Sequence, residues 1–550
     1  MPSVAVLGPV VLPLIAAAVI AAFGLAGVDL GRAAAGIGGW SSVAALFAVW
    51  VPVRSSLELI LGQLGYGSAF DLRVDAVAFA FGLMITVPAA VLLSLQPRTW
   101  QESALSLLGV AAAMATVEGG GIVLTAIAGG TAATVAVVML DIEDPRAWRP
   151  SWALLLAGWL ALTWVGAILQ VSGGTAIYSA VPVAAVTAPV FVLIAASAVL
   201  ASCMFPWRTW PARLWARPSL RAAGITVGVL YPLGFYLLVR AYELGDGRYP
   251  SAWFNVALAV VGIAAGAAAA ARAQAAATRR EFLGEVIPGF GGFALMAIAI
   301  GTPLGLVAGL VLLATASALV ACLALLPDRA GAASVLAIAA AIGLPPGLAF
   351  GGRVIGIEAT FEAGDLLGLI GVAGAAAWVV WMVGGARAIG LPGGRGHPAA
   401  ETFPRVSMLI AALTLVAGPA LAVLHFGFAN PVAGEVMPSA AGALAGGLTA
   451  VVTVSSVLPV VTLLVPLLVI AMATYAWTGT SAIHTQARPA LFPLPGAAAL
   501  DRARTAIRAA TVPEQYRSIF NIRELEAAAA GGSPVLWLAA LVALGFAVTR

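Results

Sequence analysis

Long apolar segments recur along almost the whole chain, and they decide what it can fold into. Hydrophobic residues make up 62% of the 550 positions and charged residues only 9%, whereas a soluble globular chain carries roughly 25% charged residues. An apolar helix of about 20 residues crosses the hydrocarbon core of a bilayer. The apolar runs are continuous and do not alternate, which argues against a membrane β-barrel. The sequence therefore predicts an all-α polytopic membrane protein.

The apolar segments predict about 14–16 transmembrane helices. We count sixteen segments and treat the long block 434–478 as one helix with a hydrophobic lead-in. The segments are residues 4–26, 33–53, 75–95, 103–117, 120–140, 151–171, 180–206, 220–242, 252–271, 284–301, 303–326, 332–350, 365–386, 406–428, 434–478 and 534–549. Residues 1–27 lack the basic start of a cleavable signal peptide, so we expect them to contain the first span.

The basic residues test this count, because all 27 lysine or arginine positions are arginine. Loops after odd-numbered segments hold 21 arginines, loops after even-numbered segments hold five, and Arg550 is C-terminal. Basic residues accumulate on the cytoplasmic side of a membrane. We therefore expect a multi-pass protein of a bacterial-type cytoplasmic membrane with both termini outside.

The long connection 479–533 is then cytoplasmic. Residues 498–512 are polar on one side only and carry Arg502, Arg504 and Arg508. We interpret them as an amphipathic helix on the membrane surface, with an ordinary solvated loop helix as the alternative.

Prolines interrupt two of the predicted spans in similar settings. The seventh ends with Pro206 and Pro211, and the twelfth contains Pro345 and Pro346 among glycines. Proline removes a backbone donor and clashes with the preceding turn, and the freed carbonyl groups need partners inside the protein. A pair of broken helices five spans apart indicates a transporter built from two repeats.

Few residues suggest other chemistry. Cys203 and Cys322 lie in apolar runs and are interpreted as small core residues. His397, His425 and His484 share no helix and show no metal-ligand spacing. We therefore expect no catalytic residue, no metal site, no cofactor and no nucleic-acid partner.

Five motifs occur in a recognisable order within residues 1–430. They are FDLRVDAVAFAFGL (70–83), CMFPWRTWPARLW (203–215), GFYLLVR (234–240), RREFLGEVIPGFGGFALMAIAIGTPLG (279–305) and GLPPGLAFGGR (343–353). Together they resemble the antiporter-like subunits of respiratory complex I, a family shared with multisubunit cation/proton antiporters and membrane-bound hydrogenases. The order and spacing of the motifs carry the resemblance.

The resemblance implies two inverted five-helix repeats, each with one proline-broken helix, and other membrane subunits as partners beside the lipid bilayer. The chain then divides into N-terminal helices (1–102), a first repeat (103–245), a second repeat (246–388), C-terminal helices (389–478), the amphipathic segment (479–533) and a final helix (534–550). That amphipathic segment is much shorter than the lateral helix of the family's distal subunit.

The titratable residues that the family uses near the membrane midplane are largely replaced in this chain. The fifth-helix glutamate falls near residues 128–130, and the lysines of the seventh and eighth helices fall on Ala201 and Pro232. Residues 314–326 contain neither histidine nor lysine, and Arg208 stands where the family's broken seventh helix has a histidine.

Arg353 keeps the positive charge of the family's twelfth helix. Arginine stays protonated at any accessible pH, so it can hold a carboxylate or bias a water chain but cannot readily cycle a proton. Glu358 and Glu362 lie one or two turns further on and are candidates to pair with it, with exposed loop charges as the alternative. With Arg208, these residues are the ion-pathway candidates.

Other charged residues are expected near the membrane edges. Asp75 and Arg240 are interpreted as structural anchors. Glu118, Glu281 and Glu285 lie at predicted span ends, where we favour an interfacial position over a role in ion transfer.

The leading functional hypothesis is a non-catalytic membrane subunit of a multisubunit, redox-coupled, proton- or ion-translocating complex. Its own proton channel would be degenerate, so the subunit would be a scaffold or a modified conduit. The alternative is the membrane partner of a two-component, proton-driven inorganic-carbon uptake system. A stand-alone cation/proton antiporter is least favoured, because the titratable sites that it needs are missing.

Overall fold

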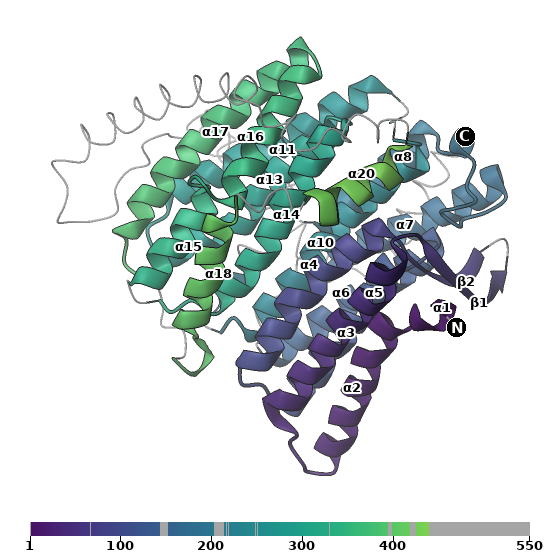
Figure 1. The fold of residues 1–550 in the computed structure, drawn as a ribbon, viewed down its shortest axis with the longest axis horizontal. Coiled ribbons are helices and arrows are strands. Elements are labelled where there is room, and N and C mark those ends of the chain that lie inside the picture. Colours follow the sequence, from purple (N-terminus) through teal and green to yellow (C-terminus); the bar gives the residue numbers. More distant parts are fainter. Residues whose placement is uncertain are drawn as a thin grey trace, which may run out of the picture.

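The structure is a computed structural model in which the chain forms a large assembly of helices (Figure 1). It describes residues 2–438 apart from 66–67, 144–151, 203–213, 216, 218, 248, 250, 329–330, 394–398 and 419–424. Within these residues, ten helices are long and apolar enough to cross a bilayer, and three shorter apolar helices accompany them. The predicted all-α polytopic membrane class is confirmed. The expected segment 479–533 and final helix 534–549 lie outside the described residues.

The helices largely follow the predicted spans. The first half contains α1 (Pro2–Ala5), α2 (Gly8–Leu25), α3 (Gly31–Val53), β1 (Leu57–Gly65), β2 (Ser68–Val74), α4 (Ala76–Leu95), α5 (Trp100–Val117), α6 (Ile122–Glu143), α7 (Trp152–Gly173), η1 (Val183–Ala185), α8 (Ala188–Ala201) and α10 (Arg221–Leu244). The second half contains α11 (Ala252–Ala275), α12 (Arg279–Gly284), α13 (Val286–Ala299), α14 (Pro303–Ala324), α15 (Ala332–Ile342), α16 (Leu348–Glu362), α17 (Asp365–Ile389), η2 (Ala399–Glu401), α18 (Pro404–Val416), η4 (His425–Ala429) and α20 (Asn430–Val436).

Helices α4, α10 and α14 form the centre of the molecule, whereas α2 and α17 lie far apart at its borders (Figure 1). The apolar window of α10 is 100% buried, and that of α2 only 22%. Helix α4 packs against α3, α10 and α14, and α11 packs against α13 and α17. Hydropathy alone does not separate these positions, because lipid tails are as apolar as the protein core.

A β-hairpin between α3 and α4 was not expected from the sequence. Strands β1 and β2 pair antiparallel, with Glu58 opposite Arg73. Backbone hydrogen bonds tie β2 to the loop after α5, since the Gly120 N–H donates to Asp71 O (3.1 Å) and the Arg73 N–H to Glu118 O (2.6 Å). The hairpin is a small addition to the all-α class and does not change it. The short alternating start of β1 is typical of a strand but is easily hidden between two long apolar spans.

The hairpin lies where loops after even-numbered spans meet. The Tyr178 N–H, after α7, donates to the Gly120 carbonyl after α5 (2.9 Å). Arg240, near the end of α10, lies 2.8 Å from an oxygen of Asp75, which precedes α4. We call this end of the molecule the hairpin end.

Loops after odd-numbered spans meet at the opposite end. Arg221 lies 3.3 Å from both Glu102 and Glu401, which follow the third and thirteenth spans. Arg279, after α11, donates to the Leu391 carbonyl after α17 (2.8 Å). The loops thus separate to two ends, as successive crossings of a bilayer require.

The twelfth span is interrupted between α15 and α16. Helix α15 ends at Ile342, Gly343 has a φ of 74°, and the Pro345–Pro346 peptide bond is cis. Helix α16 begins only at Leu348. The positive φ suits glycine, which has no Cβ to clash, and the prolines cannot donate the hydrogen bonds of a continuous helix.

Two other spans differ from their predicted limits or lie partly outside the description. Helix α8 ends at Ala201, and Pro206 and Pro211 fall outside the described residues, so the second break and the inverted repeats stay predictions. Helix α18 ends at Val416, whereas the predicted span runs to residue 428. Pro419 follows Gly418 in the sequence, and proline disfavours the helical conformation of the residue before it.

Helices α11 and α13 cross through glycines. A Cβ added to Gly292 would collide with the backbone of Gly266, and one added to Gly262 would collide with the backbone nitrogen of Met296. Small residues let membrane helices approach closely and gain van der Waals contact. The crossing therefore depends on the absence of side chains at these positions.

We expect Gly292→Ala to destabilise the purified protein in detergent by about 1–3 kcal/mol, as overpacked contacts do. Gly109→Ala in α5 is the matched control, because its added Cβ would meet Val135 at 3.6 Å, an ordinary contact. Thermal unfolding measures both. Equal melting temperatures for the two variants would contradict the tight crossing.

Candidate functional site

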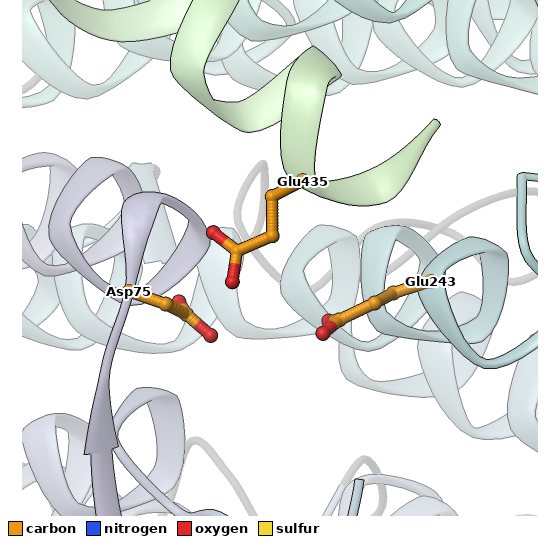
Figure 2. A group of neighbouring side chains, drawn as sticks. All are labelled: Asp75, Glu243 and Glu435. Atoms are coloured by element: carbon orange, nitrogen blue, oxygen red, sulfur yellow. The ribbon is translucent and has the colours of Figure 1, made fainter. Parts of the chain in front are cut away.

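Five charged side chains meet at the hairpin end, and we call them the hairpin-end cluster. They are Arg73, Asp75, Arg240, Glu243 and Glu435. They come from β2, the residue before α4, the last turns of α10, and α20. Figure 2 shows the three carboxyl groups pointing toward one another from these separate elements.

Asp75 is the centre of the cluster. It is fully buried, and its carboxylate accepts hydrogen bonds from Arg240 Nη2 (2.9 Å) and from the Ala78 N–H (2.7 Å). Its Oδ2 lies 3.0 Å from Arg73 Nε and 2.8 Å from Arg240 Nη1. Asp75 thus caps α4 at the end where the helix dipole favours negative charge, and the two residues interpreted as anchors are in direct contact.

Glu435 extends the cluster to α20. Its carboxylate accepts hydrogen bonds from Arg73 Nη2 (2.6 Å) and from the Ala76 N–H (2.9 Å). Arg73 Nη2 also lies 3.0 Å from a Glu243 oxygen, and Glu243 pairs in turn with Arg240. Sequence reasoning missed both glutamates. Glu435 is 362 residues from Arg73, a separation that leaves no local pattern.

The three carboxyl groups have oxygens within 4.8 Å of one another, a spacing that could also hold a metal ion. Two guanidinium groups lie among them, however, and supply the positive charge that a cation would bring. Calcium and magnesium ions prefer shells of oxygen ligands. The cluster is therefore an ion-pair network in which three carboxylates face two guanidinium groups.

Aromatic rings line the buried side of Arg240. Its guanidinium carbon lies 5.1 Å from the centre of the Tyr236 ring and 5.4 Å from that of Tyr178. Its Nε donates to the Tyr236 hydroxyl (3.1 Å), and the Tyr178 hydroxyl lies 3.3 Å from the Thr125 hydroxyl. Cation–π contacts of this kind favour a desolvated guanidinium, so the rings help to fix Arg240.

Asp71 lies beside the cluster on β2, outside the membrane-spanning helices, and is fully buried. Burial and then the neighbouring Glu58 carboxylate raise the pKa of Asp71 to about 6. Gly120 lies so close that an added Cβ would collide with the Asp71 carboxyl group. The hairpin therefore holds a carboxyl group whose pKa is raised toward the neutral range.

Arg353 is a second buried cation, located in α16 next to the helix break. Its Nη1 donates to the Ile342 carbonyl (2.6 Å) and its Nη2 to the Ala341 carbonyl (3.2 Å). The indole N–H groups of Trp378 and Trp381 donate to the same two carbonyls, at 2.8 and 3.0 Å. The carbonyl groups at the end of α15 are thereby satisfied inside the protein, and a positive charge lies at the negative end of the helix dipole.

Aromatic rings also enclose the Arg353 guanidinium. The ring centres of Phe290, Phe293 and Trp378 lie 5.0, 5.1 and 5.6 Å from its central carbon. Gly343 leaves the space that the guanidinium needs, since an added Cβ would lie 2.5 Å from Nη1. Among the described residues, no ion pair joins Arg353 to a carboxylate.

The candidate partners of Arg353 therefore lie elsewhere. Glu358 is buried in α16, whereas Glu362 ends that helix and is exposed. Glu285, which was expected at a span end, pairs with Arg272 at 2.9 Å. The described structure thus does not bring these acidic residues together with Arg353 in one site.

The remaining residues that the sequence analysis considered either lie in other parts of the structure or lie outside the described residues. Glu118 lies at the end of α5, as expected, and is completely buried under the hairpin. His425 lies in η4. Arg208, His397 and His484 lie outside the described residues.

Comparisons with known proteins show similarity in structure. No family model matches the sequence, and no curated protein matches it. The structure matches a chain of the Mrp complex from Dietzia sp. with a TM-score of 0.69 and 19% identity, over 100% of this chain and 63% of that one. The chain therefore spans less than two thirds of the length of that Mrp chain.

Two further solved structures show the same fold. A chain of respiratory complex I from Thermus thermophilus has a TM-score of 0.65 and 19% identity, over 80% of this chain and 99% of that one. A chain of the membrane-bound sulfane sulfur reductase, an archaeal respiratory membrane complex, has a TM-score of 0.65 and 15% identity, over 99% of both chains. The fold is thus that of membrane subunits of these complexes, which agrees with the resemblance, while the inverted repeats stay a prediction.

We expect Arg240→Gln to destabilise the protein by about 3–5 kcal/mol, because it leaves buried carboxylates without their partner. Asp75→Asn should lower the free energy of unfolding by less. The cluster has three carboxylates and two guanidinium groups, and this substitution removes the one excess negative charge. Asp246→Asn is the control, because Asp246 is exposed at the same end with a φ of 53°, which asparagine tolerates. A larger loss of melting temperature in Asp75→Asn than in Arg240→Gln would contradict this charge balance.

The raised pKa of Asp71 predicts a pH dependence of stability. Between its usual pKa of 3.8 and about 6, the folded state binds more protons at Asp71 than the unfolded state does. The contribution of Asp71 to stability should therefore fall as pH rises through this window, by at most about 3 kcal/mol, and stay constant above it. The decrease in melting temperature with rising pH should disappear in Asp71→Asn and remain in Asp246→Asn. An unchanged profile in Asp71→Asn would contradict the assignment.

Proposed function

We propose that the chain is an antiporter-like membrane subunit of a multisubunit, redox-coupled, ion-translocating complex, and that its own proton channel is degenerate. The observation that carries the proposal is the geometry of Arg353. The positive charge at the family's twelfth-helix position binds the carbonyl groups of a broken helix inside an aromatic enclosure. A guanidinium used in this way is a structural cap and cannot pass protons on.

The central helices support the same proposal. Helices α13 and α14 contain no charged residue, and the charged residues of α10 lie near its two ends. Ala201 and Pro232, which align with the family's lysines, are buried in apolar surroundings. A charge that crosses such a region meets a high desolvation barrier, so a proton path through this subunit would need groups other than those of the family.

The orientation follows from the two ends of the molecule. Most arginines lie in loops after odd-numbered spans, which meet at the end opposite the hairpin. On the basis of the positive-inside rule, we place that end in the cytoplasm and the hairpin end outside, in a bacterial-type cytoplasmic membrane. Both termini are then outside, and the neighbouring subunits contact the apolar border helices.

Purification of the full-length chain from its native membrane in a gentle detergent tests the parent complex. Mass spectrometry is expected to identify further membrane subunits together with redox subunits. A large soluble zinc protein as the main partner would instead favour the two-component inorganic-carbon uptake system. A chain that purifies without any stoichiometric partner would contradict the proposal.

Proton flux in the reconstituted complex tests the degenerate channel. We expect Glu358→Gln and Glu362→Gln to leave the flux per assembled complex unchanged, because the described residues do not join these groups to Arg353. Arg353→Lys keeps the positive charge but lacks the planar guanidinium group that binds the Ile342 and Ala341 carbonyls. Its effect on the flux therefore reports on the helix cap without a change of charge. Abolished flux at unchanged assembly in either glutamate variant would show that this subunit conducts protons.

A further inference from the structure

Glu118 is a buried carboxyl group that neither the ion-pair network nor the proposed function uses. It follows the last residue of α5, and its side chain is completely buried. Its backbone is well bound, since its N–H donates to Met114 O (2.9 Å) and its carbonyl accepts from the Arg73 N–H (2.6 Å). Within the described part of the chain, both carboxyl oxygens of Glu118 are buried without a hydrogen-bond partner.

The charged groups around Glu118 would not compensate the negative charge of its ionised carboxylate. Asp75 is the carboxylate whose charge acts on it, and Asp71 lies on the adjoining strand. The two guanidinium groups of the hairpin-end cluster, those of Arg73 and Arg240, already bind its three carboxylates. An ionised Glu118 would thus raise an existing excess of negative charge in a desolvated position, which is costly.

The position at the end of α5 acts in the same direction. A helix C-terminus carries partial negative charge on its last carbonyl groups, which repels a carboxylate. Tyr178 and Thr125 pair with each other. The geometry therefore favours the neutral acid, which carries a proton that can leave.

We propose that Glu118 is a proton-binding site that exchanges its proton with the aqueous phase at the hairpin end through Asp71. Asp71 is buried between Gly120 and Glu58, and Glu58 is exposed on β1. Ionisation would break the O–H bond of Glu118, and Asp71 would receive the proton.

This site lies at the hairpin end, away from the midplane positions on which the proposed function rests. It adds a group that binds and releases protons to a subunit whose family-type channel residues are replaced. It does not depend on which partners the chain assembles with, so the two ideas fail separately.

Infrared difference spectroscopy of the intact purified protein tests the site. Ordinary carboxyl groups are already ionised at neutral pH. As the pH is raised from neutral to alkaline, the wild type should lose a C=O band of a protonated carboxyl group that shifts in D₂O. Glu118→Gln should lack this band, whereas Asp246→Asn should keep it. A band of unchanged size in Glu118→Gln, or no such band in the wild type, would overturn the proposal.

Two further variants protect the test against misfolding and examine the exchange route. Glu118→Asp keeps a carboxyl group, so its band should persist at a shifted frequency; its absence in folded protein would count against the site. Asp71→Asn should keep the band but slow its shift after transfer to D₂O by about tenfold or more, the factor that a 1.4 kcal/mol higher barrier produces. An unchanged exchange rate would overturn the route through Asp71.

Discussion

The interaction on which the fold depends is the pairing of backbone polar groups where no water can reach them. Continuous helices satisfy this requirement by themselves, but the interrupted twelfth span does not. There the carbonyl groups of Ala341 and Ile342 accept hydrogen bonds from Arg353, Trp378 and Trp381. Side chains from α16 and α17 thus complete the end of α15. The break is stable because three separate donors converge on it.

The hairpin end depends on a related balance, this time of charge. Three carboxylates and two guanidinium groups from β2, α4, α10 and α20 compensate one another almost completely. Asp75 contributes twice, since it also caps α4. Because removal of water makes each pairing stronger and each unpaired charge costlier, the network orders this end. It leaves Glu118 as a buried carboxyl group whose oxygens have no hydrogen-bond partner among the described residues.

The sequence predicted the helices well because continuous apolar runs and arginine placement are strong local signals, and the even- and odd-numbered loops do meet at opposite ends. It did not predict the hairpin, because a few alternating residues between two long spans carry little weight. It placed Glu118 at a span end but did not predict its burial, since hydropathy locates span ends and not the strands that cover them. Glu243 and Glu435 were missed because ion pairs between distant segments leave no periodic pattern. Arg353 was singled out by the resemblance, but its carbonyl partners required the geometry of the break.

The capping of α15 also bears on mechanics. An interrupted membrane helix usually offers two half-helices that can turn independently about the gap. Here the Arg353 guanidinium bridges the gap from α16 to α15, and the two indoles fasten the same carbonyl groups to α17. These three helices are therefore fastened together, and a displacement within this half of the molecule would take place along their contacts with α11, α14 and α18.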